Sequence, residues 1–140
     1  MLPDDWFLVP PAYEKDQSST IDAERELGNF LRDYPSSPYV EKARPMFKEC
    51  AHMLAAHEMY VARFYWEHDR PMGTVLRLRT LLTRYPDAGF DEEALFLLGK
   101  AYVAVGRPAD ARTAWETLVS KYPAHKRAGD ARRALAKLPS

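Results

Sequence analysis

The sequence contains a single cysteine, Cys50, among its 140 residues. No internal disulfide can form, which excludes the class of small secreted domains that are stabilised by disulfides. Cys50 falls on an apolar helix face, so we expect a buried structural thiol and not a reactive one. No run of 18 apolar residues occurs, so no membrane-spanning helix is predicted. The first residues, MLPDDWFLVPP, are too acidic and too short in their apolar run to form a secretory signal.

The sequence also lacks an excess of charge of either sign. Lys and Arg together number 20, as do Asp and Glu, and the net charge is therefore zero. A nucleic-acid-binding protein normally carries a strongly basic surface, so we predict no nucleic-acid partner. A basic stretch does run from Lys121 to Lys137, with Asp130 as its single acid. Such a stretch is more often a solvated helix face than a binding patch.

Motifs for catalysis or for metal binding are missing as well. The six glycines are scattered and form no phosphate-binding loop. His57-Glu58 would need a second histidine at position 61 for a zinc-protease motif, and that residue is Val61. The spacing of His52, His57 and His68 does not suit one zinc site on a helix face. The sequence therefore predicts a protein that is not an enzyme and that holds no cofactor and no metal.

A repeated helical pattern is present, and it is clearest between Glu92 and Pro123. Two apolar stripes of helical period are separated by Gly106-Arg107-Pro108, which suits a helix end followed by a new helix start. The unit resembles a tetratricopeptide repeat. The matching residues are Leu98, Gly99, Tyr102, Gly106, Ala111, Trp115 and Pro123. Gly99 and Ala111 are expected to be small because the two helices approach closely there, and Trp115 is expected to fill the space between this unit and the next.

Earlier copies of the same unit are visible upstream. A Tyr-Pro pair closes a helix at Tyr34, at Tyr85 and at Tyr122, with 51 and then 37 residues between copies. We predict an all-α tetratricopeptide-repeat solenoid of six to seven helices in antiparallel pairs, forming one domain. Its expected parts are an N-terminal extension and repeat remnant (1–19), a partial repeat (20–55), a degenerate repeat (56–86), a good repeat (92–123) and a capping helix (125–138). The first repeat lacks most of its leading helix, so we expect the chain to be a fragment of a longer array.

Local signals place the helix ends. Ser19 or Thr20 is predicted to cap the first helix, Ser37 the second and Asp91 the fourth. Pro45 lies within the second apolar stripe, so we predict a kink or a restart there, followed by one long helix at about 46–67. A short helical turn is predicted around residues 6–9.

The order of these pieces resembles the BamD (YfiO) family of outer-membrane assembly lipoproteins. The resemblance covers residues 13–123 and rests on two segments, YPSSPY at 34–39 and HEMYVARFY at 57–65. It implies a non-enzymatic scaffold on the periplasmic face of the outer membrane in a Gram-negative bacterium. It also implies binding to the POTRA part of BamA, to other assembly-machinery lipoproteins and to unfolded outer-membrane proteins, with membrane attachment only through an N-terminal lipid that is absent from this chain. Arg77 lies where family members carry a basic residue facing BamA, although Leu76 precedes it in place of the more usual Asn.

An alternative function stays open. The last repeat would equally suit an adaptor of another envelope complex, similar to CpoB (YbgF), or a generic protein-interaction module.

Solenoid geometry indicates a second set of candidate binding residues, because the first helix of each pair lines the concave side. The expected outward positions are Met59, Arg63, Trp66, Glu67, Phe96, Lys100 and Val103. Exposed aromatic rings beside Arg and Lys are typical of an interface hot spot. The alternative is that neighbouring helices, or the N-terminal segment, cover Trp66 and Phe96; for Phe96 this alternative is slightly favoured.

Overall fold

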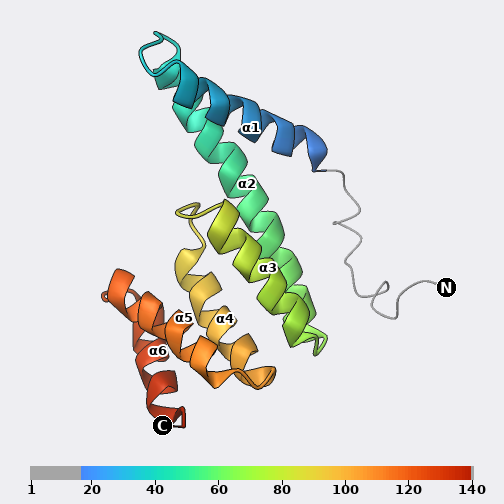
Figure 1. Cartoon of the computed structure of the whole chain (residues 1–140), viewed down its shortest axis with the longest axis vertical. Helices are drawn as coiled ribbons and strands as arrows, with labels where there is room; N and C mark the ends of the chain where they lie inside the picture. The colour runs from blue at the N-terminus through green and yellow to red at the C-terminus, as the bar shows by residue number, and fades with distance from the viewer. Residues whose placement is uncertain (1–16, 140) are drawn as a thin grey trace, which may run out of the picture.

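The computed structural model describes residues 17–139, and this range folds into six α-helices with no strand. The helices are α1 (Ser18–Asp33), α2 (Val40–Glu67), α3 (Pro71–Arg84), α4 (Asp91–Ala104), α5 (Pro108–Lys121) and α6 (Lys126–Lys137). Each helix packs against the next one in the chain, and α4 also contacts α6. Figure 1 shows α2 as the longest element, with α1 across one half and α3 along the other. The predicted all-helical repeat fold is confirmed, whereas the turn expected at residues 6–9 lies outside the described residues.

The turns α2–α3 and α4–α5 have the same backbone conformation at positions 37 residues apart. Asp69 and Gly106 occupy the left-handed region, with φ of 57° and 78°. The next residue, Arg70 or Arg107, donates its backbone N–H across the turn to a tyrosine carbonyl at 2.8 Å in both copies. This bond satisfies a carbonyl that the helix end leaves free. The turn of the predicted degenerate repeat therefore has the same conformation as the turn of the good one.

The Tyr-Pro closing pairs also adopt one conformation. Tyr34, Tyr85 and Tyr122 each end a helix with φ near −130° and ψ of 57°, 53° and 55°. Each donates its backbone N–H to the carbonyl four residues earlier at 2.9 Å. Proline follows and cannot continue the helix, because it has no N–H and restricts the residue before it. Three copies of one helix end are thus built from the same local chemistry.

Small residues let the paired helices approach closely, as predicted for Gly99. A Cβ atom added there would lie 2.1 Å from Nε1 of Trp115 on α5. The indole N–H donates to the Phe96 carbonyl at 3.1 Å, so Trp115 packs within its own helix pair. At the matching positions of the preceding pair the chain has Ala62 and Leu78. A larger residue on the first helix is therefore matched by a smaller one on the second.

Helix α2 is longer than expected and is not interrupted. It begins at Val40 and continues through Pro45, so the restart is wrong, whereas a kink at Pro45 stays a prediction. Pro45 is exposed and lies in the second turn of the helix. Because proline has no N–H, only the backbone hydrogen bond to the Glu41 carbonyl is lost. The half of α2 near Pro45 packs on α1, where Phe47 lies 3.0 Å from the Cβ position of Gly28.

The predicted caps are also wrong. The N-cap residues are Gln17, Tyr39 and Phe90, and none of them has a capping side chain. Ser37 instead accepts the Tyr39 N–H at 3.2 Å, inside the turn that precedes α2. The sequence signals identified the loops correctly but misplaced the helix starts by one to three residues, which is the usual ambiguity at helix ends.

Candidate functional site

Most of the predicted outward residues come together where the end of α2 meets α4. Phe96, Lys100 and Val103 recur at helical spacing on one side of α4, and Trp66 lies near the end of α2. Lys100 Nζ lies 5.3 Å from the Trp66 ring centroid and 5.7 Å from that of Phe96. These distances are within the range of cation–π attraction. The two rings are half-buried, while Lys100 and Val103 are exposed.

Helix α6 contributes a residue that the sequence did not identify. The Arg127 guanidinium lies 5.8 Å from the Phe96 ring centroid, so two cations lie near one ring. We call Trp66, Phe96, Lys100 and Arg127 the aromatic–cation cluster. Arg127 belongs to the basic stretch from Lys121 to Lys137, for which the sequence predicts a solvated helix face. The contact between α4 and α6 that brings it to Phe96 has no local sequence signal.

Arg63 and Glu67 lie on the same part of α2, but they differ in their contacts. Arg63 forms a two-pronged ion pair with Glu93 of α4, in which Nε and Nη2 donate to separate carboxylate oxygens at 2.7 Å each. This geometry matches the planar guanidinium to the carboxylate and holds α2 against α4. Glu67 is the exposed last residue of α2.

Met59 is not an outward residue, and its prediction as a surface position is wrong. Its side chain is fully buried in the core that α2 shares with α3 and α4. The prediction assumed that one side of α2 faces solvent at this level. Helix α3 packs on this half of α2, and side chains of α4 also reach it through the Arg63–Glu93 ion pair, so less of α2 faces solvent than in a helix with one neighbour.

Arg77 on α3 lies outside the aromatic–cation cluster. Its Nη1 donates to Oε2 of Glu58 on α2 at 3.3 Å, and its side chain remains 41% exposed while that of Glu58 is 12% exposed. Burial lowers the pKa of the neighbouring His57, and the Arg77 charge lowers it further. Arg77 therefore presents a positive charge that is held in place by a covered carboxylate.

The remaining polar residues singled out in the sequence have structural contacts. His52 Nδ1 lies 2.7 Å from the Ala88 carbonyl, and His68 Nδ1 lies 2.8 Å from that of Phe64. Cys50 is half-buried, so the prediction of a buried thiol is wrong. Among residues 17–139 no group of three or more potential ligands could hold a metal ion.

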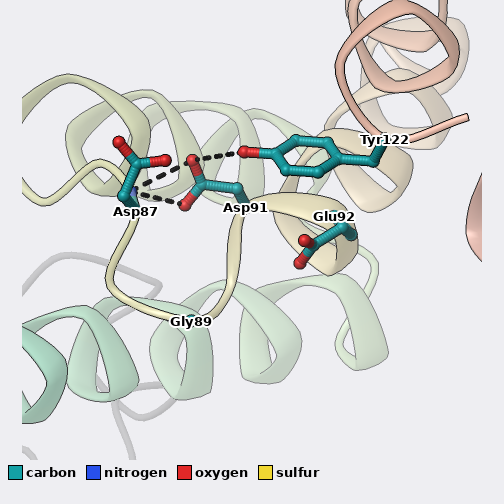
Figure 2. A pocket seen from close by; sticks show the side chains of 5 residues that line it. All are labelled: Asp87, Gly89, Asp91, Glu92 and Tyr122. Atoms are coloured by element: carbon teal, nitrogen blue, oxygen red, sulfur yellow. Dashed lines mark hydrogen bonds between the residues drawn. The ribbon is translucent and has the colours of Figure 1, made fainter. Parts of the chain in front are cut away.

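A pocket of about 200 Å³ beside the α3–α4 loop was not predicted. It is lined by Asp87, Gly89, Asp91, Glu92 and Tyr122 (Figure 2). The Asp91 carboxylate accepts the Asp87 backbone N–H at 3.1 and 3.2 Å and the Tyr122 hydroxyl at 3.3 Å. Burial and the nearby carboxylates raise the pKa of Tyr122 to about 12. Asp91, expected to cap α4 with its side chain, instead joins the loop to the end of α5.

Comparison with known proteins identifies the family. Residues 4–118 match the model of the YfiO family, described as outer membrane lipoprotein. The outer membrane protein assembly factor BamD of Xylella fastidiosa (strain 9a5c) is 30% identical over 111 residues, which is 79% of this chain and 38% of that protein. BamD of Caulobacter vibrioides is 27% identical over 121 residues, covering 86% of this chain and 40% of that protein. BamD of Haemophilus influenzae is 30% identical over 105 residues, covering 75% of this chain and 40% of that protein.

The chain thus spans about two fifths of the length of these curated relatives. None of the helices within residues 17–139 is long and apolar enough to cross a membrane. The match covers α1 to α4 and most of α5, the region that carries both segments of the sequence resemblance. The chain belongs to the YfiO family of outer membrane lipoproteins, whose curated members include the BamD assembly factors.

Proposed function

We propose that this chain is part of a scaffold that helps to assemble proteins into the outer membrane, and that it works by binding proteins and not by catalysis. The observation that carries the proposal is the family match over residues 4–118. The name assembly factor, which the relatives bear, describes such a role. The scaffold acts at the periplasmic face of the outer membrane, attached through an N-terminal lipid.

The proposed partner is the POTRA part of a BamA-like protein, and the proposed contact is Arg77. Its guanidinium is partly exposed on α3, and Glu58 restricts its motion through the ion pair. A fixed charge loses less conformational entropy on binding than a mobile one does. Helix α3 carries three arginines and no acidic residue, which favours an acidic surface on the partner. Other assembly lipoproteins and unfolded outer-membrane proteins are further proposed partners.

The test measures the affinity of purified BamA-like POTRA domains, encoded in the same genome, for the wild-type chain and for the Arg77→Glu variant. We expect a loss of roughly tenfold or more, because an attractive contact becomes a repulsive one. Arg79→Glu is the matched control, since Arg79 is exposed on the same helix but points to another side. Unchanged affinity in Arg77→Glu would remove Arg77 from the interface, and no binding by the wild-type chain would contradict the proposed partner.

A charge swap separates a direct contact from a loss of structure. Glu58→Arg combined with Arg77→Glu restores an ion pair between α2 and α3, so thermal stability should recover. Affinity should stay low, because position 58 is largely covered and cannot present its charge to a partner as position 77 does. Recovery of affinity together with stability would show that Arg77 acts only by holding α3 in place.

A second candidate function is an adaptor for another envelope complex. The observation that favours it is that α4 and α5 carry the general repeat signature, including the close contact between Gly99 and Trp115. It predicts that affinity capture with the full-length protein yields a complex that lacks BamA-like proteins.

A further inference from the structure

The aromatic–cation cluster contains two positive charges that no carboxylate of residues 17–139 neutralises through an ion pair. Lys100 and Arg127 both lie within 6 Å of the Phe96 ring centroid. Among residues 17–139 neither side chain forms an ion pair with a carboxylate. The nearby Glu93 is already paired with Arg63, and Asp130 on α6 is paired with Arg133. Two like charges beside one ring favour an anionic group between or above them.

Apolar side chains lie beside these charges. Trp66 and Phe96 are half-buried and provide ring faces beneath the cations, and Val103 is 45% exposed one turn further along α4. Contact with the rings restricts the side chains of Lys100 and Arg127 and reduces the entropy lost when an anion binds. A ligand that fits this chemistry has a carboxylate next to an apolar side chain.

We infer that the aromatic–cation cluster is a docking surface for an acidic linear segment of a partner protein. Carboxylates of the segment bind Lys100 and Arg127, and the neighbouring apolar side chains pack on Trp66 and Val103. Charge complementarity is the argument for this occupant, and the exposed apolar contacts favour a peptide over a purely ionic ligand. The inference rests on the proposed scaffold function, and it assigns to α2, α4 and α6 a contact separate from Arg77 on α3.

The test measures fluorescence anisotropy of a labelled peptide of alternating aspartate and leucine residues with the whole chain. A peptide with asparagine in place of aspartate is the matched probe. We expect the acidic peptide to bind and the asparagine peptide to bind at least roughly tenfold more weakly. Lys100→Gln and Arg127→Gln should each weaken the acidic peptide roughly threefold to tenfold, with a smaller dependence on salt.

Two further variants control for changes in overall charge. Lys48→Gln removes an exposed charge from the far half of α2 and should leave peptide affinity unchanged. Glu67→Gln removes the exposed acid next to Trp66 and should raise affinity, because this acid repels an acidic peptide. Circular dichroism of each variant verifies that the helices remain folded.

Three outcomes would overturn the inference. The first is equal binding of the two peptides, and the second is no effect of Lys100→Gln and Arg127→Gln. The third is binding to phosphatidylglycerol vesicles, lost in the same two variants, when the acidic peptide does not bind. If the peptide fails while the POTRA domains still bind in an Arg77-dependent manner, this inference falls and the proposed scaffold function stands.

Discussion

Replacing Gly99 with alanine tests the close contact between α4 and α5. The added Cβ atom would lie 2.1 Å from Nε1, 2.3 Å from Cε2 and 2.6 Å from Cδ1 of Trp115. Since ordinary contact begins at 3.4 Å, the indole has to move by more than about 1 Å. It is held between the two helices by its N–H bond to the Phe96 carbonyl, so this movement breaks the bond.

The expected cost follows from three contributions. Overpacking costs about 1–3 kcal/mol, and the lost hydrogen bond costs about 1 kcal/mol. In the opposite direction, alanine stabilises a helix interior by about 1 kcal/mol relative to glycine. The free energy of unfolding should therefore fall by about 1–3 kcal/mol, which corresponds to a decrease in Tm of roughly 3–12 °C for a chain of this size. Urea unfolding followed by far-ultraviolet circular dichroism measures this change without depending on the displaced tryptophan.

Two comparisons make the test specific. Gly129→Ala on α6 has no neighbour closer than 3.8 Å, so it should stabilise the chain by up to about 1 kcal/mol. Gly99→Ala combined with Trp115→Leu copies the Ala62–Leu78 pair of the preceding repeat and should recover part of the loss. If Gly99→Ala is as stable as Gly129→Ala, or if the double variant is no better than the single one, the close contact does not determine the residue at position 99.

Two other predictions concern polar contacts. Burial, the charges of the nearby carboxylates and the hydrogen bond to Asp91 raise the pKa of Tyr122 to about 12 in the folded chain from an unfolded value of about 10. The folded chain therefore favours the neutral phenol, and this contribution to stability is complete below pH 10 and is lost as the pH rises towards 12. Urea unfolding should show that the free energy of unfolding falls less between pH 8 and pH 11 in the Tyr122→Phe variant than in the wild-type chain. An equal decrease in both would mean that the titration of other groups dominates. Arg63→Ala and Glu93→Ala should each lower the free energy of unfolding by about 0.5–1 kcal/mol, and a double-mutant cycle should show coupling between them, because both side chains are partly exposed. A coupling energy of zero would show that the ion pair between Arg63 and Glu93 does not stabilise the fold.

Local signals in the sequence were sufficient for the repeat fold. Gly106, Pro108 and the Tyr-Pro pairs have backbone requirements that act over a few residues, so their spacing predicts helix ends. Met59 shows the limit of this reasoning. Its burial depends on the side chains that α3 and α4 bring to the shared core, which is a property of the assembled array and not of α2 alone.

The candidate site was predictable only in part. Phe96, Lys100 and Val103 share a face of α4 because of helical spacing alone. Arg127 reaches Phe96 through the contact of α4 with α6, and Arg77 is tied to Glu58, 19 residues earlier in the chain. Contacts between elements of this kind leave no periodic trace. The division into repeats at 20–55, 56–86 and 92–123 stays a prediction.

The geometry of helix α2 determines which insertions and deletions this chain tolerates. Phe47 meets α1 at Gly28, and Tyr65 meets α3 at Gly73. The two aromatic residues are 18 positions apart, which equals five full turns and about 27 Å, so they point in the same direction. Adding or removing one residue between them would turn one contact by about 100° and move α1 away from the side of α2 that carries α3. Length changes of about seven residues would preserve the direction and alter only the distance, so the rotational phase of α2, more than its length, sets the path of the whole array.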